Sequence, residues 1–229
     1  ISEKTDGNYT FADKEVRFRI EEVSASLTLP PRANDLTYIG ETREQELVTG
    51  GTAAGGHIEY ALDGGSYSKE IPKAEDAGTY TVTYKVVGDS NHADGQEGSV
   101  TVTIKPKQVI SPKVTVSGSY TYDGSAKEPA AADIEVKDGT TTIPTNQYEA
   151  TCRDNINAGT ATVIISSVNG GNYIVNGMGT FEITKGTASV ATNPTGLTNL
   201  PYNGTEQALV QAGAASGGMM VYSLTKDGP

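Results

Sequence analysis

The sequence predicts an all-β fold built from tandem, small β-sandwich repeats. Three observations predict it: segments recur at fixed offsets, apolar and polar residues alternate within short runs, and Asp-Gly or Asn-Gly pairs separate these runs. Alternation with a period of two is typical of half-buried strands. Strands that are separated by turns roughly every 8–12 residues are typical of sandwich folds.

The strongest repeat relates two segments that lie 162 positions apart, as Gln45 and Gln207 do. The residues that are identical at this offset are, in the first copy, Gln45, Leu47, Val48, Gly51, Ala53, Gly55, Gly56, Tyr60 and Leu62, and in the second copy Gln207, Leu209, Val210, Gly213, Ala215, Gly217, Gly218, Tyr222 and Leu224. Before Gln45 the offset is 164, as Tyr38 and Tyr202 show, so the first copy has two additional residues. Self-similarity at a fixed period indicates a repeat architecture.

A second relation has half that offset: Ala77–Val82 resembles Ala158–Val163, 81 positions later. Three short segments at the ends of alternating runs also resemble one another, namely Phe18–Ile20, Val102–Ile104 and Phe181–Ile183. We therefore expect two alternating repeat types of about 80 residues each, joined by linkers such as 105–107. The expected parts are the C-terminal strands of a preceding repeat at 1–24, a repeat of the first type at 25–107, a repeat of the second type at 108–185, and the N-terminal part of a further first-type repeat at 186–229.

The individual strands follow from the alternation. The inward residues that it predicts are Tyr80, Val82, Tyr84 and Val86, then Val100, Val102 and Ile104, then Ala161, Val163 and Ile165. Val, Ile, Thr and Tyr suit a pleated, half-buried surface. The turn pairs Asp63-Gly64, Asp123-Gly124, Asp138-Gly139 and Asn203-Gly204 favour tight hairpin turns. No window keeps a helical apolar stripe, so no helix is predicted.

Several short motifs recur in a constant order. They are Tyr122–Pro129, Asn157–Val163, Gly171–Tyr173 and Asp76–Val86. These motifs resemble the MBG family, the mostly beta, glycine-rich, Ig-like repeats of bacterial surface proteins. The resemblance covers nearly the whole chain and implies tandem Ig-like β-sandwich repeats arranged as an elongated rod.

The resemblance also implies a function and a location. It implies a structural spacer or stalk of a cell-surface, cell-wall or secreted adhesin-like bacterial protein, which projects a binding region from the cell. It supplies no catalytic residues and no cofactor, so we expect no enzyme activity. The implied partners are neighbouring repeats of the same chain and a host or glycan ligand.

Composition and charge narrow the classes of partner. The formal net charge is −11, which disfavours nucleic acids and anionic membrane surfaces. No apolar run is long enough to span a bilayer, so no membrane insertion is expected in this segment. Cys152 is the single cysteine, so no disulfide can form within the chain.

One loop gathers oxygen-bearing side chains. Asp89, Asn91 and Asp94 would suit Ca²⁺, which prefers oxygen ligands. Their spacing does not match an EF-hand, and a turn capped by its own side chains explains them equally simply. The turn is the favoured reading, and no metal, cofactor or catalytic site is predicted.

The remaining reactive residues also have simple structural readings. His57 and His92 are expected to be unrelated loop histidines, since a site would need them adjacent. Cys152 is expected to be a buried, unreactive thiol on a strand. Lys85 and Lys105 lie on predicted strands and are candidates for an internal isopeptide bond, but the alternation directs both toward solvent.

Carbohydrate or host-ligand binding is the alternative function. Sugar faces stack on exposed aromatic rings, and Tyr67, Tyr120 and Tyr148 would serve, although the chain has no Trp and alternation places most Tyr side chains in cores.

A separate expectation concerns residues 186–229, which would form only part of a sandwich. We expect residues 1–24 of the same chain, or a second molecule, to supply strands that complete it.

Overall fold

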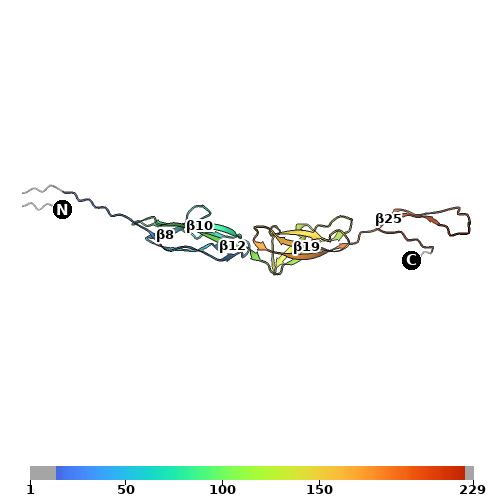
Figure 1. The fold of residues 1–229 in the computed structure, drawn as a ribbon, viewed down its shortest axis with the longest axis horizontal. Coiled ribbons are helices and arrows are strands. Elements are labelled where there is room, and N and C mark those ends of the chain that lie inside the picture. Colours follow the sequence, from blue (N-terminus) through green and yellow to red (C-terminus); the bar gives the residue numbers. More distant parts are fainter. Residues whose placement is uncertain (1–13, 225–229) are drawn as a thin grey trace, which may run out of the picture. The chain divides into compact units, whose positions relative to one another are not determined.

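The computed structural model describes residues 14–224, and it is an all-β protein with several sheets. The chain divides into two compact units, Ile1–Lys105 and Pro106–Pro229. Figure 1 marks β8, β10 and β12 in the first unit and β19 in the second. The helices among the described residues are two 3-10 turns, η1 (Ala131–Asp133) and η2 (Thr145–Gln147), and neither is long or apolar enough to cross a membrane.

The first unit is centred on a four-stranded sheet. Its strands are β1 (Val23–Ser24), β2 (Ser26–Leu29), β3 (Arg32–Ala33), β4 (Leu36–Thr37), β5 (Gln45–Glu46), β6 (Val48–Thr49), β7 (Thr52–Ala54), β8 (Gly56–Leu62), β9 (Lys73–Ala74), β10 (Gly78–Gly88), β11 (His92–Ala93) and β12 (Glu97–Lys105). The main sheet has the order β4-β12-β10-β8, and its three long strands run antiparallel. Two-stranded ladders β2–β7, β3–β6, β5–β9 and β1–β11 complete the unit.

The core of this unit lies where the alternation predicts it. Val82, Val102 and Ile104 are almost completely buried, so β10 and β12 direct one face inward. Tyr80 and Tyr84 share that face of β10 but are only half-buried. The turn after β8 confirms the hairpin chemistry, because Asp63 and Gly64 both have positive φ, 47° and 79°.

The second unit has two packed sheets. Its strands are β13 (Lys107–Gln108), β14 (Lys113–Val116), β15 (Tyr120–Thr121), β16 (Ile134–Asp138), β17 (Thr141–Thr142), β18 (Tyr148–Arg153), β19 (Gly159–Ser167), β20 (Tyr173–Ile174) and β21 (Gly177–Thr184). Strands β13 and β20 form a separate two-stranded sheet, and the two packed sheets have the orders β15-β21-β19-β18 and β14-β16-β17. They approach closely at Gly179, where an added Cβ would lie 2.7 Å from Val114 Cγ1. Val136 and Val163, one from each sheet, are fully buried, as a sandwich core requires.

In each unit a late strand pairs in parallel with a short strand from early in the unit. In the first unit β12 pairs with β4, and Tyr38 N donates a hydrogen bond to Lys105 O at 2.8 Å. In the second unit β21 pairs with β15, and Tyr122 N donates to Thr184 O at 2.9 Å. We call β12 and β21 the closing strands.

The last part of the chain repeats the beginning of the first unit strand by strand. Its strands are β22 (Ser189–Thr192), β23 (Thr195–Gly196), β24 (Val210–Gln211) and β25 (Ala214–Ser216). The ladder β22–β25 repeats the pairing of β2–β7 with Ser189 in the place of Ser26, an offset of 163, and with the same irregularity after its second pair. The ladder β23–β24 has the register of β3–β6.

A hydrogen bond across a turn is repeated as well. Gly213 N donates to Tyr222 Oη at 2.8 Å, as Gly51 N donates to Tyr60 Oη at 3.0 Å in the first unit. The offset of 162 therefore describes structure as well as sequence. We call residues 186–224 the C-terminal segment.

The C-terminal segment differs from the first unit in burial. Leu47 and Val48 have no exposed surface, whereas the equivalent Leu209 and Val210 are 55% and 38% exposed. The cause is the missing cover: residues 186–224 contain no counterparts of β10 and β12.

We expected residues 1–24 or a second molecule to provide this cover. In the structure the strands β22 to β25 pair only among themselves, and residues 14–22 form no strand. Residues 1–13 lie outside the described residues. Within residues 14–224, the complementation expected inside the chain is therefore not found, and completion by a second molecule stays a prediction.

Candidate functional site

The loop after β10 uses its carboxylates in its own hydrogen bonds. Asp89 Oδ1 accepts from Asn91 N at 2.9 Å and lies 2.7 Å from His92 Nδ1. Asp94 Oδ1 accepts from Gly88 N at 2.9 Å. The contact with His92 and the bond from Asn91 lower the pKa of Asp89. This geometry is that of a self-capped turn, and no group of three or more His, Cys, Asp or Glu side chains in residues 14–224 could hold a metal ion.

The two histidines have separate carboxylate partners. His57 Nε2 lies 3.4 Å from Glu59 Oε1, whereas His92 contacts Asp89. The ring of His92 also lies against Gly55, where an added Cβ would approach it to 2.6 Å. Each ring is therefore part of a local polar contact with its own partner.

A cluster around Lys85 was not predicted from the sequence. Lys85 Nζ lies 3.4 Å from Glu59 Oε2 and 4.6 Å from the centroid of the Tyr67 ring. Desolvation opposes ionisation of Glu59, but the hydrogen bonds from His57 and Lys85 outweigh it and lower the pKa of the carboxyl. The cation–π contact uses one face of the Tyr67 ring, which reduces the surface left for a sugar.

The other lysine considered for a covalent crosslink is exposed. Lys105 Nζ forms an ion pair with Asp35 Oδ1 at 2.6 Å, and the Asp35 side chain is 86% exposed. The hydrogen bond and the charge of Lys105 lower the pKa of Asp35. The Lys105 side chain is 61% exposed, so this pair is a surface ion pair and lacks the burial that an amine in an isopeptide site requires.

Cys152 lies on β18 and is half-buried, which is less enclosed than expected. Burial raises the pKa of its thiol, and the negative charge of Glu128 adds to the effect. A raised pKa reduces the thiolate fraction at neutral pH, which is the opposite of what a nucleophile needs.

Two of the three tyrosines predicted to bind a sugar instead pack inside the second unit. Tyr148 is buried and donates to Ile134 O at 3.1 Å. Tyr120 is half-buried, packs on Phe181 with ring centroids 4.8 Å apart, and donates to Ser117 O. Tyr67 is the one of the three that is exposed, at 40%. The remaining exposed tyrosines among the described residues are Tyr122, Tyr202 and Tyr222.

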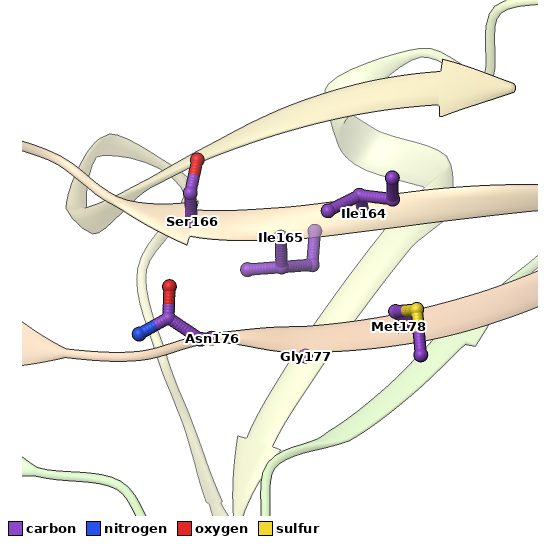
Figure 2. A pocket seen from close by; sticks show the side chains of 6 residues that line it. All are labelled: Ile164, Ile165, Ser166, Asn176, Gly177 and Met178. Atoms are coloured by element: carbon purple, nitrogen blue, oxygen red, sulfur yellow. The ribbon is translucent and has the colours of Figure 1, made fainter.

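A shallow hollow of about 360 Å³ lies over β19 and β21 in the second unit (Figure 2). Its lining consists of Ile164, Ile165, Ser166, Asn176, Gly177 and Met178. These residues include two with polar side chains, Ser166 and Asn176, but none with a titratable side chain. The lining of this hollow therefore supplies no general acid or base.

Comparisons with known proteins give no further guide: no family model matches the chain, and no curated protein matches its sequence.

Proposed function

We propose that this chain is a structural spacer or stalk segment of a bacterial cell-surface or secreted adhesin-like protein, in which tandem Ig-like sandwich repeats form an elongated rod. The observation that carries the proposal is the repetition of the β2–β7 and β3–β6 ladders, with the same registers, in the C-terminal segment. Repeated units whose contacts are mainly with their neighbours serve proteins in which length and spacing matter.

A hydrogen bond from a tyrosine hydroxyl in the first unit supports the Ig-like part of the proposal. Tyr80 lies near the start of β10 and donates to Asp76 O, four residues upstream, at 2.7 Å. A tyrosine in this place, bonded back to the chain before its strand, is a hallmark of Ig-like sandwiches. Val82 then fills the position, two residues later, at which antibody domains carry a buried cysteine. The second unit has Ala161 at the position that corresponds to Tyr80, so it lacks this bond.

The connection between the units supports a spacer. The strand β12 ends at Lys105 and β13 begins at Lys107, so Pro106 alone separates the two strands. Short linkers that contain proline restrict bending. A net charge of −11 would also keep neighbouring chains apart on a crowded surface.

Small-angle scattering on the whole chain tests the rod. The comparison is with a variant that carries a Gly-Ser insertion after Pro106, which would let the units reorient freely. A rod predicts a larger maximum dimension and a narrower distribution of distances for the natural chain than for the variant. Identical scattering curves would contradict the proposal.

The spacer role is tested by display on a bacterial surface. A small ligand-binding domain would be anchored with and without this chain beneath it, and its access to a bulky ligand would be measured. A spacer predicts better access with the chain, and no gain contradicts it.

Direct sugar binding, favoured by the exposed Tyr67, is tested on a glycan array, where specific binding that Tyr67→Ala abolishes would support that alternative.

A further inference from the structure

The strand β18 is the longest strand at the edge of a sheet in the second unit. It ends the order β15-β21-β19-β18, pairs with β19 over six residues, and has no strand of residues 14–224 on its other side. In an antiparallel ladder, alternate residues direct both their N–H and their C=O groups toward the same neighbour. The remaining residues of β18 therefore direct theirs toward the open edge, where a further strand can bond to them.

The equivalent edge of the first unit is covered. There β8 holds the place of β18, at the end of the order β4-β12-β10-β8. The chain after β8 turns back along it, so that Tyr60 N donates to Ser68 O at 2.7 Å and Ser68 N donates to Tyr60 O at 2.9 Å. In the second unit a comparable main-chain bond lies beyond the end of β18, from Lys127 N to Asn155 O at 2.7 Å. The edge along residues 149–153 is therefore left open.

The strand β18 lacks features that edge strands commonly use against pairing. Residues 148–153 include no proline and no lysine, and their ladder with β19 has no bulge. The regular strand ends at Asp154, which has a φ of 54°. Residues 149–153 thus form a regular, extended edge that another strand can join along its whole length.

The outward face of β18 carries two opposite charges that are placed symmetrically about Thr151. Glu149 lies two residues before Thr151 and Arg153 lies two residues after it, so alternation puts all three side chains on one face. All three residues are exposed. The ion pairs found among residues 14–224 include neither of these two charges. Both are therefore free to pair with charges on another molecule.

The opposite face of β18 is apolar and incompletely covered. Ala150 and Cys152 lie on the same face as the buried Tyr148, yet Ala150 is exposed and Cys152 is half-buried. Their partners on β19, Ile165 and Val163, are 1% and 0% exposed. The core of the second unit therefore ends between β19 and β18, and apolar surface remains at the edge that a further strand would remove from water.

We propose that β18 pairs antiparallel with β18 of a second copy of this chain, about a two-fold axis through Thr151. In this ladder Thr151 lies opposite Thr151 of the second copy, Ala150 lies opposite Cys152, and Glu149 lies opposite Arg153. Opposite charges directly across a ladder stabilise it, and like charges destabilise it. Shifting the register by two residues puts one charge opposite Thr151, and shifting it by four puts Glu149 or Arg153 opposite its own like charge. Charge complementarity therefore selects this register.

The pairing is isologous, because both copies contribute the same residues. It joins the two four-stranded sheets into one continuous sheet, with main-chain bonds giving affinity as in other cases of β-augmentation. The ladder is short, and the net charge of −11 on each copy opposes close approach, so the association is weak and depends on concentration. It uses the second unit alone and does not depend on the spacer role.

Exchanging charges between the copies tests the register by sedimentation velocity. Glu149→Arg and Arg153→Glu each put like charges opposite each other when identical copies pair. Each variant alone is expected to dimerise at least about tenfold more weakly than the natural chain. A mixture of the two variants has opposite charges at every charged pair and is expected to associate as the natural chain does. Glu149→Arg also reduces the net negative charge, so general charge repulsion predicts stronger association for this variant, which is the opposite result.

Disulfide trapping in a Cys152→Ser background tests the position of the axis. Thr151→Cys lies opposite itself across the axis, where Cα atoms of an antiparallel ladder are about 4.5–5.5 Å apart and within disulfide reach. Mild oxidation is expected to give a covalent dimer. The matched control is Thr180→Cys, an exposed position on the outward face of β21, two strands away from the open edge. It is expected to remain monomeric.

Three results would overturn the proposal. The first is a natural chain that stays monomeric at every concentration, whatever other extended segment the edge accepts. The second is a mixture of Glu149→Arg and Arg153→Glu that associates no better than either variant alone, whereas restored association also shows that both variants fold. The third is equal crosslinking of Thr151→Cys and Thr180→Cys, which would report random collision instead of a defined ladder.

Discussion

Replacing Tyr60 by Phe removes one hydroxyl from the core of the first unit and leaves the ring in place. Tyr60 is 5% exposed, and its Oη accepts a hydrogen bond from Gly51 N at 3.0 Å. Gly51 is half-buried, and its backbone is closely packed on the side of Leu29, since an added Cβ would lie 2.5 Å from Leu29 O. Water therefore has little room to replace the lost acceptor. A hydrogen bond is worth about 1 kcal/mol net, and an orphaned buried donor costs about 1–3 kcal/mol. We expect the unit to lose about 2 kcal/mol of its free energy of unfolding, or about 30-fold in the equilibrium constant.

The C-terminal segment supplies a matched control. Tyr222 makes the same bond with Gly213 N at 2.8 Å, but its side chain is 47% exposed. Water can replace the hydroxyl there, so Tyr222→Phe is expected to change the stability of the segment by less than about 0.5 kcal/mol. Both variants remove the same hydrogen bond, so the difference between their losses of stability reports the effect of burying the tyrosine hydroxyl.

Native-state hydrogen exchange followed by mass spectrometry is the appropriate assay. The chain has two units, so a single unfolding free energy for the whole molecule is not well defined, whereas peptides from β8, β10 and β12 report on the first unit alone. Tyr60→Phe should accelerate exchange in these strands and leave β19 and β21 unchanged. Unchanged exchange in β8 and β10, or an equally large effect of Tyr222→Phe, would refute the argument from enclosure.

Three further predictions follow from particular contacts. Gly51→Ala should destabilise the first unit by about 2 kcal/mol or more in the same exchange assay, because its Cβ would overlap a backbone carbonyl; a silent variant would contradict this packing. Cys152 should react with a disulfide reagent at neutral pH more slowly than glutathione does, because burial and the charge of Glu128 raise the pKa of its thiol. Asp89 should titrate below the usual carboxyl range in an NMR experiment, because its bond with His92 lowers its pKa. The ionised Asp89 therefore stabilises the loop above the unfolded-state pKa, and this stabilisation is lost as the pH falls through the lower folded-state pKa. Asp89→Asn should remove that part of the acid dependence of loop stability. An unshifted titration of Asp89 would be evidence against its contact with His92.

Long, strongly alternating strands could be predicted from the sequence. Val82, Val102 and Val163 alternate with polar residues over enough positions that only one face can be apolar, and all three are buried on the central strands. The turn at Asp63-Gly64 could also be predicted, because positive φ at two successive positions is accessible to few residue pairs.

Contacts between distant parts of the chain could not be predicted in the same way. The strands β4 and β15 have two residues each, too few for a periodic signal, and their parallel partners lie more than sixty positions away. The half-burial of Tyr84 on an inward face depends on where the opposing layer ends, which alternation along one strand does not report. The Lys85–Tyr67 contact was missed for a similar reason, since Tyr67 lies in the connection after β8.

The parallel pairing of early and late strands has a mechanical consequence. In the first unit β1 pairs in parallel with β11 and β4 with β12, and in the second unit β13 pairs with β20 and β15 with β21. A force that pulls the two ends of a unit apart drags such strands past each other along their length. The hydrogen bonds of each ladder are then loaded together in shear, instead of being opened one at a time like a zipper. A unit built in this way resists tension best along the line that joins its own ends, which suits the spacer role proposed above.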